Sequence, residues 1–263
     1  MHSVISPSLK VICSPGSQVM PAGQGVWRLE VPAGTGGKYR LAQLDDYTGT
    51  PRRRFPWRPP VILSLRARAS AEALPGTWGF GLWNDPFSLS LGFGGGTRHF
   101  PTLPNTAWFF YASPPNYLSL RDDLPAQGFL AATFRSEPLP APILAALSPG
   151  VAFFALPPAA RLLRRLARRF IRQDAVLVGD RATSRLADWH AYQFGWNQDN
   201  VIFSVDGETM LETSVSPRGP LALVLWIDNQ YAALPPTGRL SFGALPSPQP
   251  AWIEIGDLSL TLP

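Results

Sequence analysis

The chain has 263 residues, of which 45% are hydrophobic and 16% charged, so it can form a large hydrophobic core and is not a disordered tail. A single cysteine, Cys13, excludes a disulfide within the chain and a zinc site built on cysteine pairs. The three histidines are too scattered for a histidine-based metal centre, and we expect neither a metal nor a cofactor.

The net charge of +5 comes from one short segment. Residues 161–172 contain six arginines and no acid, and subtracting these six charges leaves −1 for the rest of the chain. A basic face spread over a domain is typical of nucleic-acid binding. A single basic segment indicates instead a membrane surface, an acidic partner or a solvated helix face, and we expect no nucleic-acid partner.

The first 13 residues lack a basic start followed by a long apolar run. This pattern predicts no secretory signal peptide. It favours a cytoplasmic protein, with a peripheral position at a membrane as the alternative.

Short apolar segments between proline- and glycine-rich turns follow one another along most of the chain, and they predict strands. The expected strands are residues 27–31, 39–44, 61–69, 78–83, 107–112, 129–134, 190–196, 201–205, 221–227 and 252–260. In residues 190–196 the large side chains recur at period two, and Asp206-Gly207 is suited to a tight hairpin turn. So many strands with so little helix predict an all-β sandwich or barrel, formed as a single domain over residues 1–263.

Residues 158–173 are the exception. On a helix, their apolar side chains occupy one half and their arginines the other, which predicts an amphipathic helix. Residues 139–160 carry no charge but contain five prolines, which argues against a membrane-spanning helix. We therefore expect residues 139–173 to be an insertion in the sandwich, an apolar loop followed by a helix over about 157–173. The arginines expected at its surface are Arg161, Arg164, Arg165, Arg168, Arg169 and Arg172.

Three uses of the apolar half of this helix remain open. It can pack on the sandwich, which is the ordinary behaviour of a surface helix. It can pack on a second copy of the chain. It can also lie in the interface of an anionic membrane, with the arginines at the lipid headgroups.

Four segments, in this order, carry a family resemblance: Arg66–Ala69, Pro75–Trp83, Trp189–Trp196 and Val201–Glu208. They resemble the concanavalin A-like lectin/glucanase fold and, more narrowly, the family sixteen glycoside hydrolases, over roughly residues 25–135 and 185–260. The resemblance implies a jelly-roll β-sandwich with a carbohydrate cleft on its concave sheet. For the hydrolases it also implies a retaining mechanism with two carboxylates about 5–5.5 Å apart.

The strand in the place of the hydrolases' catalytic strand, residues 105–112, contains no acid. Those enzymes carry alternating carboxylates there, so none of their catalytic residues can be transferred to this chain. The leading hypothesis is therefore a carbohydrate-binding protein without the usual glycosidase acids. The alternative is a glycoside hydrolase with relocated acids, for which Asp85 and Asp228 are the candidates.

Candidate ligand-binding residues are aromatic and polar side chains on or near the expected concave sheet, because an aromatic ring suits the apolar face of a sugar. They are Trp83, Asn84, Asp85, Trp108, Tyr111, Asn116, Trp226 and Asp228. Turn and core roles compete with this interpretation, since Asn84-Asp85-Pro86 is typical of a turn. The acid-free aromatic strand also leaves open an apolar small molecule as ligand or substrate, and the insertion leaves open a membrane- or lipid-associated protein.

Overall fold

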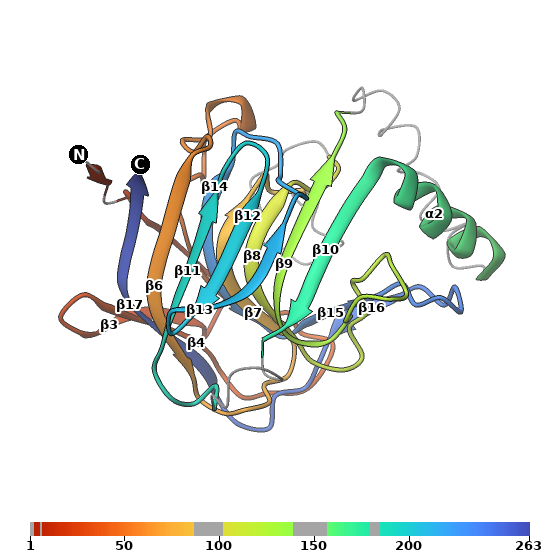
Figure 1. Ribbon diagram of the computed structural model, residues 1–263. Coiled ribbons are helices and arrows are strands. Elements are labelled where there is room, and N and C mark those ends of the chain that lie inside the picture. The colour runs from red at the N-terminus through yellow and green to blue at the C-terminus, as the bar shows by residue number, and fades with distance from the viewer. Residues whose placement is uncertain (1–2, 6, 87–101, 139–156, 179–184) are drawn as a thin grey trace.

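The computed structural model describes residues 3–5, 7–86, 102–138, 157–178 and 185–263. Figure 1 shows two stacked antiparallel sheets, with one helix beyond the edge of the second sheet. The first sheet has eight strands: β1 (Ser3–Ile5), β3 (Gln18–Gly23), β4 (Val26–Val31), β6 (Val61–Ala69), β11 (His190–Trp196), β12 (Val201–Val205), β13 (Glu208–Thr213) and β17 (Ala251–Leu262). The second has seven: β2 (Lys10–Cys13), β5 (Leu41–Asp45), β7 (Thr77–Trp83), β8 (Thr106–Ala112), β9 (Gly128–Ser136), β10 (Ile171–Leu177) and β14 (Ala222–Asp228).

The strand order confirms the predicted all-β jelly-roll sandwich. It is β13-β12-β11-β6-β17-β4-β3 in the eight-stranded sheet, where β1 also pairs with β17, and β10-β9-β8-β7-β14-β5-β2 in the seven-stranded sheet. The remaining elements are a two-stranded sheet of β15 (Gln230–Ala233) and β16 (Ser241–Ala244), the 3₁₀ helix η1 (Arg52–Arg54) and the helix α2 (Pro157–Phe170).

The inner faces of the two sheets form the main hydrophobic core, because every second side chain of a strand points to the same face. Tyr192, Phe194 and Trp196 of β11 are all buried in it, as their period-two spacing predicts. From the opposite sheet, Phe80 approaches the Tyr192 ring with 5.1 Å between centroids, and Phe109 approaches Phe203 at 5.3 Å.

The seven-stranded sheet is also covered on the face that points away from the eight-stranded sheet, which we call its outer face. A second apolar cluster lies there, including Trp108, Phe110, Phe134 and Trp226. All seven residues of β8 and all seven of β14 are therefore buried. Two-sided burial explains why these strands read as continuous apolar runs without polar alternation.

Two glycines of β7 make room for indole rings on the outer face. A Cβ atom added to Gly79 would lie 2.3 Å from the Phe109 carbonyl oxygen and 2.9 Å from the Trp226 ring. A Cβ atom added to Gly81 would lie 2.5 Å from the Cβ of Trp108. The two indoles thus lie over bare backbone, which is why the strand alternates glycine with large residues.

Helix α2 forms as predicted, but only part of its apolar half packs on the sandwich, through Ala167. Leu162, Leu166 and Phe170 are 54%, 42% and 42% exposed, whereas Arg164 is only 4% exposed. Arg164 is therefore not a surface residue, because its guanidinium is held by groups of the surrounding loops. Arg172 lies on β10 rather than on the helix, and the predicted apolar loop at 139–156 lies outside the described residues.

Four other arginines of the segment, Arg161, Arg165, Arg168 and Arg169, are exposed on α2 as expected, and Arg172 is exposed on β10. In the described part of the chain, no helix has the length and apolar character needed to cross a membrane.

Replacing Gly79 by alanine should lower the free energy of unfolding by about 1–3 kcal/mol, because the new methyl group must displace backbone and the Trp226 ring. Gly195→Ala is the matched control in β11, where no heavy atom lies within 4 Å of an added Cβ. The control should leave stability unchanged or raise it by up to about 1 kcal/mol. Urea denaturation of the two variants measures the difference, and equal stabilities would contradict the close approach of Trp226.

Candidate functional site

Three of the predicted aromatic residues come together on the outer face of the seven-stranded sheet. Trp83, Trp108 and Trp226 project from the neighbouring strands β7, β8 and β14. The rings of Trp83 and Trp226 are nearly parallel, at 5° and 6.4 Å between centroids. The Trp108 ring lies 5.5 Å from Trp226 and 6.3 Å from Trp83. We call these three residues the tryptophan cluster.

Exposure differs across the tryptophan cluster. Trp108 is 6% exposed and Trp226 is 8% exposed, while Trp83 at the end of β7 is only partly buried. The Trp83 ring also meets Tyr47 edge-on, with 6.0 Å between centroids. The indole N–H of Trp108 is buried and finds no acceptor among the described residues. Trp83 is thus the accessible end of the cluster, and Trp108 holds an unused donor.

The sequence prediction missed two aromatic neighbours of the cluster. Phe110 stacks on Trp108 with 5.1 Å between centroids, and Phe134 of β9 meets Trp108 edge-on at 6.3 Å. Phe110 was accessible to sequence reasoning, because it lies two residues after Trp108 and so shares its face of the strand. Phe134 depends on the pairing of β8 with β9, which the sequence does not show.

Tyr111 is not part of the site, contrary to the prediction. It lies three residues after Trp108, so it points to the opposite face of β8. There it belongs to the main core and stacks on Trp78, at 5.7 Å between centroids and 16° between planes. The aromatic run of β8 therefore divides between the two faces of the sheet.

Asn84 and Asn116 hold loops in place. The Asn84 side chain donates to the Leu103 carbonyl and accepts from the Asn105 amide, both at 2.9 Å. Asn116 is fully buried; its Nδ2 donates to the Ser113 carbonyl at 2.9 Å, and its Oδ1 accepts from the Ala232 amide at 3.0 Å. In both residues the side-chain oxygen and nitrogen each bind the backbone, so the structure gives them a role in holding loops.

Asp85 is buried in the turn after β7, where its φ of 48° lies in the left-handed region. Arg52 donates from its guanidinium to the backbone carbonyls of both Asn84 and Asp85. Burial lowers the pKa of Arg52, and the nearby Asp85 carboxylate opposes that effect. This turn therefore joins η1 to the end of β7 beside Trp83.

The structure does not bring Asp85 and Asp228 together, so the prediction of a relocated carboxylate pair is wrong. In the register of β7 with β14, Trp83 lies opposite Ala222 and Thr77 lies opposite Asp228. Asp85 lies two residues beyond Trp83, at the far end of β7 from the position that faces Asp228. The six residue steps from Thr77 to Trp83 correspond to about 20 Å of strand, so the two acids are at least that far apart. Glycosidase pairs are about 5–10 Å apart.

Asp228 is buried beneath the edge of the tryptophan cluster in a hydrogen-bonded chain. The Trp226 indole donates to the Thr77 hydroxyl at 3.1 Å, and that hydroxyl donates to Asp228 Oδ1 at 2.7 Å. Tyr39 donates to Oδ2 at 3.3 Å. Burial raises the pKa of Asp228 to about 7, although these hydrogen bonds favour the ionised form. Asp228 thus orients Trp226 through Thr77.

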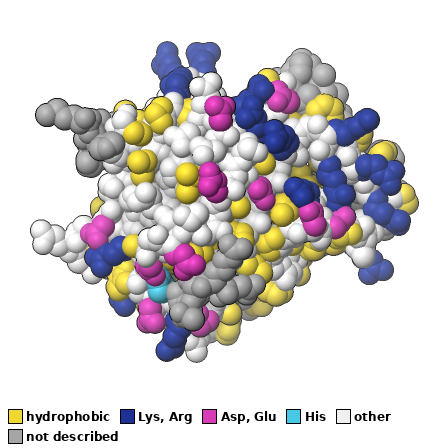
Figure 2. Space-filling view, viewed as in Figure 1, with side chains coloured by type: hydrophobic (Ala, Val, Ile, Leu, Met, Phe, Trp, Pro, Cys, Tyr) yellow, Lys and Arg dark blue, Asp and Glu magenta, His cyan; other side chains and the backbone are white. Residues whose placement is uncertain are grey.

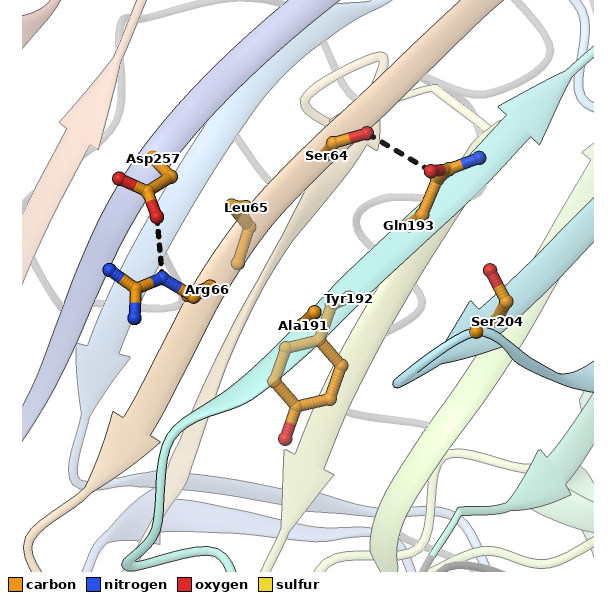
Figure 3. A pocket seen from close by; sticks show the side chains of 9 residues that line it. Ser64, Leu65, Arg66, Ala191, Tyr192, Gln193, Ser204 and Asp257 are labelled. Atoms are coloured by element: carbon orange, nitrogen blue, oxygen red, sulfur yellow. Dashed lines mark hydrogen bonds and ion pairs between the residues drawn. The ribbon is translucent and has the colours of Figure 1, made fainter.

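A shallow depression lies on the opposite side of the molecule, on the eight-stranded sheet (Figure 3). Its volume is about 220 Å³, and small side chains of β6, β11 and β12 form much of its floor. Its main polar groups already bind one another. Arg66 Nε donates to Asp257 at 2.5 Å, and the Ser64 hydroxyl donates to Gln193 at 3.4 Å. Among the described residues, no three His, Cys, Asp or Glu side chains gather as a metal site.

No protein-family model matches the chain, and no curated protein matches it in sequence. Solved structures do match. A family 16 endo-glucanase from Bacteroides ovatus superposes with a TM-score of 0.50 at 11% identity, covering 95% of this chain and 86% of that one. A legume lectin-like domain from Entamoeba histolytica has a TM-score of 0.47 at 10% identity, covering 96% and 87%.

The chain has a concanavalin A-like fold. At such low identity the similarity shows the fold alone, and it agrees with the resemblance seen in the sequence. In this fold the acid-free strand β8 lies inside the seven-stranded sheet, between β7 and β9, with Trp108 and Phe110 on its outer face.

The variant Asp228→Asn should flatten the dependence of stability on pH. The pKa of Asp228 is about 7 in the folded protein and about 3.9 in an unfolded chain, so the folded state binds the extra proton between these values. The free energy of unfolding should therefore fall as pH rises from about 4 to about 7. An asparagine accepts from Thr77, donates to the Tyr39 oxygen and does not titrate.

Urea denaturation at pH 4, 5.5, 7 and 8 measures this effect as the difference between the variant and the unmodified protein. The unmodified protein should lose more stability over this range than Asp228→Asn does. Asp257→Asn, whose parent carboxylate is exposed on the other sheet, serves as the control. Parallel profiles for the unmodified protein and Asp228→Asn would show that folding does not raise the pKa of Asp228.

Proposed function

We propose that the protein binds a carbohydrate on the outer face of its seven-stranded sheet and does not hydrolyse it. The observation that carries this proposal is the tryptophan cluster, in which Trp83, Trp108 and Trp226 meet on one face. A flat indole suits the apolar face of a sugar ring, and a few polar groups then orient the hydroxyls. Trp83, which is only partly buried, is the ring of the cluster that a sugar can reach.

The fold supports the class of ligand by analogy. The Bacteroides ovatus endo-glucanase of this fold was solved in complex with a compound named G4G3G-2F-DNP, and another family 16 protein of that organism was solved in complex with a G4G4G3G product. A shared fold suggests where to look for a ligand, whereas function follows from the residues of the site.

The proposal excludes hydrolysis for two reasons. Strand β8 carries Thr106, Trp108 and Phe110 on its outer face, and the strand has no acid to protonate a leaving group or attack a sugar. The relocated pair that the sequence offered is separated by the length of β7. An aromatic floor crossed by a strand without acids fits retention of a sugar better than its cleavage.

Trp83→Ala should weaken binding of the best glucan oligosaccharide by about tenfold or more, because a partly exposed indole that stacks on a ligand is a typical binding hot spot. Isothermal titration across a panel of β-glucan oligosaccharides measures the affinity. Trp252→Ala is the matched control, since Trp252 is also partly buried but lies on β17 of the other sheet, where Arg28 covers its ring at 4.3 Å. The control should bind like the unmodified protein.

Three results would contradict the proposal. If no oligosaccharide of the panel binds, the protein does not bind these carbohydrates. If Trp83→Ala and Trp252→Ala bind with equal affinity, the carbohydrate does not bind at the tryptophan cluster. If a bound glucan releases reducing sugar, the protein is a hydrolase.

A further inference from the structure

Helix α2 carries a row of apolar side chains on its outer surface. Leu162, Leu166 and Phe170 follow one another at four-residue steps, so they lie on one side of successive turns. Each is at least 42% exposed. An exposed row of large apolar residues on a helix is unusual for a soluble surface and indicates contact with another apolar body.

The orientation of the row follows from the opposite side of the helix. Arg164 Nη1 donates to the Ser119 carbonyl at 2.5 Å and to the Leu234 carbonyl at 2.8 Å. Its Nη2 pairs with Asp122 at 2.6 Å, and its guanidinium lies 5.3 Å from the centre of the Tyr117 ring. Turning the helix to bury its leucines would strip a buried charge of all these contacts.

A second contact fixes the same side. Arg168 Nη2 pairs with the other oxygen of Asp122 at 2.6 Å, so one carboxylate holds two arginines one turn apart. Both arginines lower the pKa of Asp122, which keeps this carboxylate ionised. Arg164 and Arg168 thus face the protein, while the row of Leu162, Leu166 and Phe170 faces outward, unlike the apolar stripe of an ordinary surface helix.

Three more arginines form a row beside the apolar one. Arg161, Arg165 and Arg169 have the same four-residue spacing and are exposed, about a quarter turn around the helix from the leucines. The helix contains no acid, and in the described part of the chain its ion pairs are those of Arg164 and Arg168 with Asp122. Figure 2 shows basic side chains gathered at the right of the view, over α2.

We propose that this surface of α2 docks on an anionic membrane. The apolar row would enter the boundary between headgroups and acyl chains, and the arginine row would lie against lipid phosphates. A helix of 14 residues is about 21 Å long and lies flat in such an interface. Charge complementarity selects this occupant over a second copy, because another α2 brings further arginines and no acid.

Sedimentation of the full chain with lipid vesicles tests the proposal. Binding should be strong to phosphatidylcholine vesicles that contain 30% phosphatidylglycerol and weak to phosphatidylcholine alone, and it should decrease with added salt. The double variant Arg165→Gln/Arg169→Gln should lower the partition coefficient about thirtyfold, from about fivefold for each arginine. Arg53→Gln/Arg54→Gln removes the same charge from exposed positions on η1 and should change it far less.

A second pair of variants tests the apolar row. Leu166→Gln/Phe170→Gln should abolish vesicle binding, whereas Ile202→Gln/Phe242→Gln, at residues 36% and 40% exposed elsewhere, should retain it. All four side chains are exposed, so each variant should keep the thermal unfolding midpoint of the unmodified protein. Trp83→Ala should bind vesicles normally, because this proposal is independent of the carbohydrate site.

Three outcomes would overturn the proposal. Equal binding to neutral and anionic vesicles would show that the lipid charge does not drive binding. Equal binding by the α2 variants and their controls would show that α2 does not contact the membrane. A dimer in size-exclusion chromatography that Leu166→Gln/Phe170→Gln dissociates would identify a second copy as the partner of this surface.

Discussion

The seven-stranded sheet must be buried on both faces, and much of the structure depends on this constraint. Its inner face packs on the other sheet, while its outer face carries a second apolar cluster. Each large side chain that is fully buried contributes about 1.5–3 kcal/mol, so neither face can be left open without a large loss. Gly79 and Gly81 are part of the same solution, because the absence of their side chains lets two indoles lie close to the sheet.

The sequence predicts those features that follow from local periodicity. Alternation in β11 and β12 identifies the side chains of the inner face, and the continuous apolar run of β8 indicates a strand that is covered on both sides. The same rule separates Trp108 from Tyr111, which are three residues apart. The prediction placed both in one site because it followed their aromatic character rather than their parity along the strand.

Features that depend on contacts between distant segments were not predictable in this way. The register of β7 with β14 places Asp85 and Asp228 at opposite ends of the pair, and no sequence pattern encodes that register. The orientation of α2 depends on Asp122, Ser119 and Leu234, which lie 42 to 70 residues from Arg164 along the chain. An amphipathic pattern states which side chains share a face, but not which face points inward.

The proposed membrane surface and the proposed carbohydrate site belong to one rigid part of the protein. Helix α2 ends at Phe170, and β10 begins at the next residue, so no linker separates them. Ile171 and Ala175 of β10 are buried in the outer-face cluster together with Trp108 and Trp226, and Ala167 of the helix packs against it. Two surfaces joined by buried contacts keep a constant relative orientation. A helix held flat on a bilayer would therefore set the direction in which Trp83 faces relative to that bilayer.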